Sequence, residues 1–538
     1  MTIDISDIPD AAQRRNISFY AVLIFLVAPL WCAVPLAWAF VLYALHTGRI
    51  WSYSLSGLGL FAVALSEVIF SVHHFHLTRQ LSVLSNKGHG SIPEIQIAFQ
   101  RILKAGLAQL SPAEYDEETL DEERPGSPEE DIVQLEVDDH RAVDFRNTLR
   151  TWFGRQPWST VRLHQVRQWI YWSIFNTHLP QPENLPQSHR DVLDDALDLL
   201  QKRLGKRIPE GSDDSCRPIL LNLDKATVLW RPFIFYAFTA AVNLSLDRWY
   251  QRSHGFSRGI HHGLEYLVRV PQNWRPSADP RPVVFLHGLG LGLLQYHSFL
   301  SHLVQEFADR PLLIILQPHI SQNIFHTRYL NPMPRKQTTQ TLASLLASFN
   351  WANLDPVMNT SDEEGQIPDG RGPRSSGVTI LSHSNGSYCH AWMLKDYPHM
   401  VTRSCFVDPV TFCGWEGDVC RNFFYKTCYT GTELLVRYFV GTELGVVNLL
   451  QRNFDWSSNS LWYEEIPNAR DSSKTLFLLG DQDSIIAPAR VKRYLRSHGI
   501  RKGLWCDPNG RHGQALLAGG EGCKVVYEWL KERESRKV

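Results

Sequence analysis

The sequence predicts an α/β fold in which a mostly parallel central sheet carries helices on both faces. Three short apolar runs support this prediction, and each ends abruptly in small or polar residues: residues 281–292, 378–387 and 475–486. Continuous apolar runs of this length are typical of strands that are buried on both faces. Because the carboxyl ends of parallel strands meet at one edge of a sheet, the residues after these runs are expected to line a common crevice.

The run at 378–387 reads Val-Thr-Ile-Leu-Ser-His-Ser-Asn-Gly-Ser and ends in a serine framed by small residues. This pattern places Ser384 on a sharp strand-to-helix turn, where its hydroxyl would point into the crevice. The usual pattern has glycine two residues before and two residues after such a serine. Here Gly386 fits that pattern, whereas Ser382 departs from it.

Two further groups that would activate this serine follow other predicted strands. A serine hydroxyl needs an imidazole to accept its proton, and the imidazole needs a carboxylate to fix its tautomer. His512 lies in a loop after a short predicted strand, and Asp483 follows the run that begins at 475. Asp483 is the preferred acid, with Asp481 and, after the preceding strand, Asp408 as alternatives. The predicted order along the chain is therefore serine, acid, histidine.

This order, preceded by the His-Gly-Leu-Gly segment at 287–290, resembles the α/β-hydrolase superfamily over about residues 260–530. Segments 408–415, 422–425, 452–456 and 461–462 are similar, more narrowly, to membrane-anchored fungal α/β-hydrolases that are themselves uncharacterised. The resemblance implies the following site residues: Ser384 as nucleophile, His512 as base, and the backbone N–H groups of Asn385 and of Leu289 or Gly290 as oxyanion donors.

A serine at position 384 indicates acyl chemistry, in contrast to enzymes of this fold that attack with an aspartate. The sequence therefore predicts a serine hydrolase, of esterase or lipase type, that cleaves an ester or thioester without a cofactor or a metal ion. Two alternatives stay open. One is an acyltransferase that uses the same three residues, and the other is a non-catalytic binding or scaffold protein that retains the fold.

Composition limits the class of partner. The chain has 538 residues, 44% of them hydrophobic, and a formal net charge of −1, which excludes a nucleic-acid partner on electrostatic grounds. Its nine cysteines lack paired spacing, so a reducing compartment is expected. The sequence does not indicate the oligomeric state.

Two apolar stretches, 17–45 and 55–72, predict a membrane anchor within residues 1–90, although Glu67 interrupts the second stretch. The flanking positive charge favours a hairpin with both ends and the catalytic domain in the cytosol. The alternative is a re-entrant or interfacial second helix, which would place the main domain across the membrane. Four residues carry this flanking charge: Arg14, Arg15, Arg79 and Lys87.

The rest of the chain divides into a helical region at 91–255, with an acidic linker at 112–139, and the α/β-hydrolase domain at 256–538. An insertion at about 409–472 has helical character, and the resemblance to the superfamily implies that it forms a cap over the site. Its aromatic residues predict either an apolar pocket for a lipophilic substrate or the cap's own core. These residues are Phe412, Trp415, Phe423, Phe424, Tyr425, Tyr438, Phe439, Trp456 and Trp462.

Overall fold

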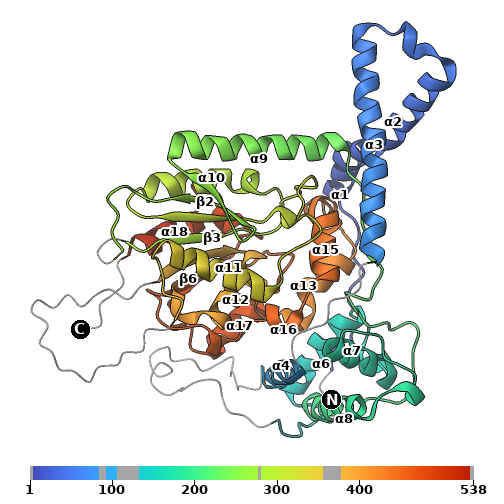
Figure 1. The fold of residues 1–538 in the computed structure, drawn as a ribbon. Coiled ribbons are helices and arrows are strands. Elements are labelled where there is room, and N and C mark those ends of the chain that lie inside the picture. The colour runs from blue at the N-terminus through green and yellow to red at the C-terminus, as the bar shows by residue number, and fades with distance from the viewer. Residues whose placement is uncertain (1–3, 84–91, 106–131, 277–279, 356–376, 533–538) are drawn as a thin grey trace, which may run out of the picture.

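The computed structural model describes residues 4–83, 92–105, 132–276, 280–355 and 377–532, and an eight-stranded sheet lies at its centre (Figure 1). The strand order is β1-β2-β4-β3-β5-β6-β7-β8. Strand β2 runs antiparallel to both of its neighbours, β1 and β4. All the other neighbouring pairs, from β4 through β3 to β8, are parallel, which confirms the predicted mostly parallel sheet. The strands are β1 Ser257–His261, β2 Leu264–Arg269, β3 Val283–Leu286, β4 Leu312–Leu316, β5 Val378–His383, β6 Val401–Val407, β7 Thr475–Gly480 and β8 Leu504–Asp507.

Helices cover both faces of this sheet (Figure 1). Alternate side chains of a strand point to opposite faces, so in β3 Val283 and Phe285 pack into one core, and Val284 and Leu286 pack into the other. The first core lies beneath α9 (Phe233–His254), α10 (Leu293–Glu306) and α18 (Glu521–Lys531). The second lies beneath α11 (Arg335–Ser348), α12 (Gly386–Asp396) and α17 (Pro488–Ser497).

The predicted cap insertion is helical and connects β6 to β7. It packs against the N-terminal apolar helix at Gly431. The two backbones are so close there that a Cβ added to Gly431 would lie 2.6 Å from the Ser18 carbonyl oxygen. The Gly431 N–H also donates to the Ser18 hydroxyl at 3.0 Å. The cap elements are η9 Gly414–Glu416, α13 Asp418–Cys420, η10 Arg421–Tyr425, α14 Gly431–Val436, η11 Arg437–Gly441, α15 Leu444–Arg452, α16 Trp456–Asn459 and η12 Tyr463–Glu465.

A helical region beside the sheet is built around buried tryptophans. Trp152 packs against Trp169 and Trp172, and its indole N–H donates to the Trp415 carbonyl of the cap at 2.8 Å. Much of the predicted acidic linker, residues 112–131, lies outside the described residues. The elements of this region are α4 Ile92–Lys104, α6 His140–Leu149, η4 Arg150–Phe153, η5 Trp158–Thr160, α7 Leu163–Phe175, η6 Pro182–Asn184 and α8 Gln187–Leu204.

Two long apolar helices form a hairpin that projects beyond the rest of the molecule (Figure 1). The first comprises α1 Ile17–Val22, the π-turn η2 Leu23–Val27 and α2 Ala28–Thr47, and the second, after η3 Arg49–Ser52, is α3 Leu55–Val83. The second helix is therefore longer than the predicted stretch. Glu67 accepts hydrogen bonds from the N–H groups of Phe233 and Ile234, at 2.6 and 3.0 Å. The Glu67 carboxylate, which interrupts the second apolar stretch, thus caps the first turn of α9.

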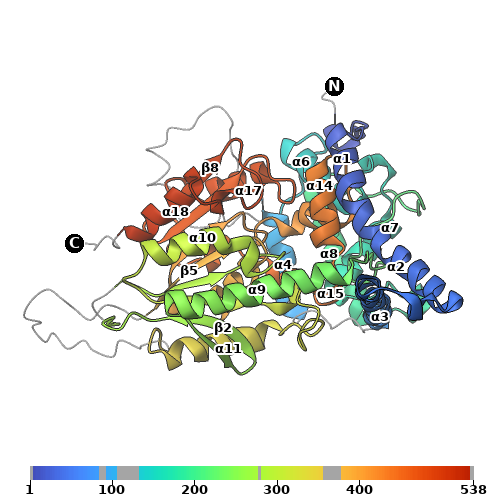
Figure 2. The same cartoon turned by 90° about the horizontal axis from the view of Figure 1, so that it is seen from above.

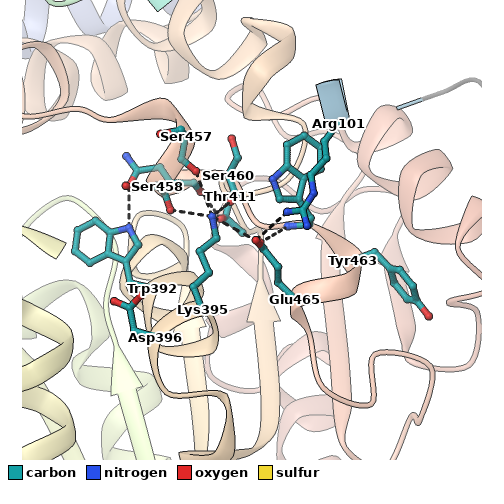
Figure 3. Close-up of polar contacts among 12 residues, drawn as sticks. Arg101, Trp392, Lys395, Asp396, Thr411, Ser457, Ser458, Ser460, Tyr463 and Glu465 are labelled. Carbon is teal, nitrogen blue, oxygen red and sulfur yellow. Dashed lines mark hydrogen bonds and ion pairs between the residues drawn. The ribbon is translucent and has the colours of Figure 1, made fainter. Parts of the chain in front are cut away.

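A lysine on α12 joins three parts of the chain (Figure 3). The Lys395 ammonium donates to the carbonyls of Ser457, Ser458 and Ser460 at 3.2, 3.4 and 2.5 Å, around the C-terminal end of α16. Glu465 lies 3.6 Å from this ammonium and pairs at 3.0 Å with Arg101 of α4. The network ties the helix that follows Ser384 to the cap and to the helical region.

We expect Lys395→Met to lower the free energy of unfolding by about 2 kcal/mol, because it leaves part-buried carbonyls without a donor. Denaturant unfolding of the full chain in detergent measures this change. Lys502→Met, which replaces an exposed lysine, is the control and should have little effect. Equal stability of the two variants would contradict the structural role of Lys395.

Candidate active site

Ser384 occupies a strained turn between β5 and α12. Its φ angle of 51° lies in the left-handed region that non-glycine residues rarely adopt. The turn is held by the Ser384 N–H, which donates to the Val407 carbonyl at 3.0 Å. At Gly386 an added Cβ would lie 2.2 Å from the Leu286 carbonyl oxygen, so only glycine permits this approach of α12 to β3.

Ser382, which stands where the usual pattern has glycine, is buried and hydrogen-bonded. Its side chain is fully buried, and its hydroxyl lies 2.9 Å from His390 Nδ1, while His390 Nε2 lies 3.0 Å from the Ser404 hydroxyl. Burial lowers the pKa of His390 to about 3, so this imidazole is neutral. The serine therefore joins β5 to α12 and β6 by hydrogen bonds.

The structure brings together three side chains that are far apart in the sequence. His512 Nε2 lies 2.8 Å from Ser384 Oγ, and His512 Nδ1 lies 2.5 Å from Asp483 Oδ2. Asp483 Oδ1 accepts the N–H groups of Ile485 and Ile486 at 2.7 and 3.2 Å, which orients the carboxylate. The arrangement allows the imidazole to take a proton from the serine while the carboxylate holds its other nitrogen.

The two alternative acids occupy other positions. Asp481 pairs with Lys492 at 2.8 Å, so it is not the acid that contacts His512. Asp408 is fully buried and accepts the N–H groups of Gly480 and Gly513, at 2.9 and 2.7 Å. It therefore ties the end of β7 to the loop that carries the histidine.

The ligand atoms of Asp408, Asp483 and His512 lie within 4.8 Å of one another, a spacing that would suit a metal ion. Each of these groups already has hydrogen-bond partners within the site, however. Both oxygens of each carboxylate accept the hydrogen bonds described above, and both imidazole nitrogens have partners. Hydrogen bonding within the site accounts for this cluster.

Two opposing effects act on the imidazole. Burial by itself lowers the pKa of His512, but the charge and hydrogen bond of Asp483, with the charge of Asp408, outweigh burial and raise the pKa to about 9. Burial raises the pKa of Asp408 to about 6. Above that pH Asp408 is ionised and helps to hold the proton on the imidazole.

The glycine-rich segment after β3 supplies backbone donors beside the serine. Leu289 lines the same pocket as Ser384 and Asn385, whereas the Gly290 N–H donates to the Ile320 carbonyl at 3.0 Å. Of the two predicted alternatives, Gly290 thus has its N–H engaged elsewhere, and Leu289 remains the candidate donor. Asn243 of α9 steadies this segment, because its side chain donates to the Leu291 carbonyl at 2.9 Å and accepts the Leu294 N–H at 3.1 Å.

Tyr296 connects the glycine-rich segment to the serine turn. Its hydroxyl accepts the Gly288 N–H at 2.8 Å and lies 2.6 Å from His383 Nδ1. Burial and the charges of His512 and His287 lower the pKa of His383 well below its usual value, so this ring is neutral. Sequence reasoning missed both Asn243 and Tyr296. No local motif marks them, since they act only across the folded structure.

Comparisons with known proteins add limited information. No protein-family model matches the chain, and no curated protein matches it. Among solved structures, a membrane phospholipase A described as a bacterial virulence factor is 14% identical and is matched over 55% of this chain and 92% of its own, with a TM-score of 0.33. Naproxen esterase (carboxylesterase NP) from Bacillus subtilis is 11% identical, over 55% and 97%, with a TM-score of 0.34.

A third solved structure, an α/β-hydrolase enzyme from a Medee basin deep-sea metagenome library, is 15% identical over 52% of this chain and 98% of its own, with a TM-score of 0.34. Similarities this low carry no argument about activity. The strand order, the antiparallel β2 and the serine turn after β5 decide the fold. The chain has the α/β-hydrolase fold.

A narrow apolar pocket with a cavity volume of about 30 Å³ opens in front of Ser384 in this α/β-hydrolase domain. Aromatic cap residues enter it in part: Phe423 and Phe424 line the pocket, whereas Trp415 and Trp462 stack on each other in the core. Some of the cap aromatics therefore line the pocket, and others form part of the core. The lining residues are Leu221, Leu289, Ser384, Asn385, Tyr388, Val410, Val419, Cys420, Phe423, Phe424, Leu450, Phe454 and Ile485.

We expect Tyr296→Phe to slow the reaction of Ser384 with a fluorophosphonate by about tenfold, since the buried Gly288 N–H and His383 each lose a partner. Timed labelling of the full chain measures the rate. Tyr397→Phe, at the far end of α12, is the control. If both variants react at the wild-type rate, the hydroxyl does not help to hold the glycine-rich segment in place.

The reaction of Ser384 needs a neutral His512, so its rate should rise with pH and level off above about 9, the raised pKa of this imidazole. Asp408→Asn removes a neighbouring negative charge and should move the midpoint to lower pH. Asp481→Asn, whose carboxylate pairs with Lys492, should leave it unchanged. The measurement is the labelling rate of each variant as a function of pH. An equal midpoint in both variants would contradict the effect of Asp408.

Proposed function

We propose that this protein is a membrane-anchored serine hydrolase that cleaves an ester or thioester of a lipophilic substrate. One observation carries the proposal: the hydrogen-bonded chain Ser384, His512, Asp483 stands at the head of an apolar pocket. A binding module would need neither the strained serine nor the imidazole within 2.8 Å of its oxygen.

In the first half of the reaction, Ser384 Oγ attacks the carbonyl carbon of the ester and His512 Nε2 accepts the hydroxyl proton. The oxygen of the tetrahedral intermediate receives hydrogen bonds from the backbone N–H groups of Asn385 and Leu289. His512 then gives its proton to the leaving alcohol, and the acyl group remains on Ser384.

In the second half, a water molecule attacks the acyl-enzyme while His512 removes its proton. Collapse of the intermediate returns the proton to Ser384 and releases the acid. Asp483 stays ionised throughout, holds the Nδ1 proton of His512 and stabilises the imidazolium. An acyltransferase would differ only in the acceptor, with a second alcohol in place of water.

The exposure of the two apolar helices supports membrane anchoring. In the most apolar 18-residue stretch of each helix, only 17% and 28% of the residues are buried. A core helix of a soluble domain is mostly buried, so a hairpin this exposed needs an apolar surrounding. The exposed side chains include Leu36, Leu60 and Ile69.

Contacts of the N-terminal residues favour a hairpin over a single span. Asp4 pairs with Arg146 at 2.7 Å, and Asp10 pairs with Arg150 at 2.7 Å. The residues before the first apolar helix thus bind the helical region that follows the second. Both ends of the hairpin then lie on the side of the catalytic domain, and the flanking arginines favour the cytosol as that side.

The composition of the pocket favours a substrate whose acyl group is apolar. Its walls are mostly hydrocarbon, so an acyl chain would be removed from water on binding. An anchor in the bilayer would place this pocket near a supply of lipophilic esters.

Ser384→Ala should abolish fluorophosphonate labelling and lower the turnover of decanoyl p-nitrophenyl ester by at least about a thousandfold, because the nucleophile is lost. Ser188→Ala, at an exposed serine of α8, is the matched control and should keep both. Full turnover by Ser384→Ala, or no labelling of the intact wild-type chain, would refute the proposal. Products formed with added butanol show whether water or an alcohol is the preferred acceptor.

A further inference from the structure

The helix α9 presents two different faces along its 22 residues. Tyr236, Thr239, Asp247 and Tyr250 recur at helical spacing and are buried against the domain. The opposite face is uncovered and carries large apolar side chains near its N-terminal half and arginines near its end. Its exposed members are Ile234, Phe238, Ala241, Leu244, Ser245, Arg248, Trp249 and Arg252.

The outward apolar side chains are unusually exposed for their size. Ile234 and Phe238 keep 59% and 60% of their surface in contact with solvent. A helix with apolar and aromatic residues on one face, together with arginines, is the pattern of an amphipathic helix that lies in a membrane interface. The arginines add attraction to anionic headgroups.

The position of α9 relative to the hairpin supports the same conclusion. In Figure 1, α9 runs roughly perpendicular to α3 on the side of the domain from which the hairpin projects. In Figure 2, seen from above, α3 is viewed end-on while α9 lies lengthwise and uncovered across the domain. The outward face of α9 is therefore turned toward the side on which the hairpin would enter a bilayer.

Two contacts show where along the length of the hairpin α9 is attached. Glu67 of α3 caps its first turn, and Trp31 of α2 stacks on Trp230 with ring centroids 5.0 Å apart. From these residues to the tip, α3 extends about 18 Å and α2 about 24 Å, at about 1.5 Å per residue. With the tip loop added, this reach approaches the hydrocarbon thickness of about 30 Å. Arg49 and Tyr53 then lie near the far interface, where such side chains are favoured.

We propose that α9 lies flat in the interface of the membrane that the hairpin enters, with Ile234 and Phe238 among the lipid acyl chains and Arg248 and Arg252 at the headgroups. This inference rests on the membrane anchoring proposed above. The bilayer is thus a second partner surface of the catalytic domain, distinct from the hairpin. It fixes the tilt of the domain as well as its attachment.

The test uses the full chain in vesicles of phosphatidylcholine and phosphatidylserine, with the photoreactive residue p-benzoylphenylalanine at position 238. The control is the same residue at position 354, because Leu354 is 48% exposed and follows α11 on the opposite face of the sheet from α9. After irradiation, mass spectrometry counts lipid adducts at each position. We expect at least fivefold more lipid adduct at 238 than at 354.

Each other outcome has a definite meaning. Equal adduct yields at 238 and 354, in a chain that resists alkaline extraction from the vesicles, would overturn the role of α9 and leave the anchoring intact. A cross-link from 238 to a second copy of the chain would overturn it in favour of a protein interface. A chain that alkaline carbonate releases from the vesicles would overturn the anchoring itself.

Discussion

The close approach of α12 to the end of β3 sets the geometry on which the site depends. Gly386 lies against the Leu286 carbonyl with no room for a Cβ, and two residues before it Ser384 adopts a φ of 51°. Such a conformation is costly for serine, so neighbouring contacts must offset it. The bond from Ser384 to Val407 and the buried link from Ser382 to His390 do so. The hydroxyl is therefore presented to the imidazole in one position rather than several.

The strands and the three reactive groups could be predicted because each signal is local. A strand buried on both faces is continuously apolar, and Ser384 and Asp483 follow two such strands, β5 and β7. His512 lies in the loop after the short strand β8, which is only half-buried. The sequence favoured Asp483 as the acid but left two alternatives open, because Asp481 and Asp408 satisfy the same local rule. It depends on which side chain Lys492 pairs with and which N–H groups lie nearby, and these are properties of tertiary packing.

The part that the helical region plays in the site was not predictable for a related reason. Leu221 lines the pocket, and the adjacent Asn222 donates to the Phe454 carbonyl at 3.1 Å. Residue 454 is more than two hundred positions away, and no periodicity connects the two. The contact of Gly431 with Ser18 likewise joins the cap to the first apolar helix. The pocket wall is thus assembled from the helical region, the sheet domain and the cap, and the first apolar helix packs against that cap.

These contacts form a continuous path from the hairpin to the backbone donors beside Ser384. Glu67 caps α9, and ten residues along the same helix Asn243 holds both the Leu291 carbonyl and the Leu294 N–H. A carboxylate that accepts two backbone N–H groups, part-buried and remote from bulk water, is a strong link. A shift of the hairpin relative to the domain would have to break that link or carry α9 with it. Because α9 positions the glycine-rich segment, the orientation of the hairpin and the shape of the site are determined together.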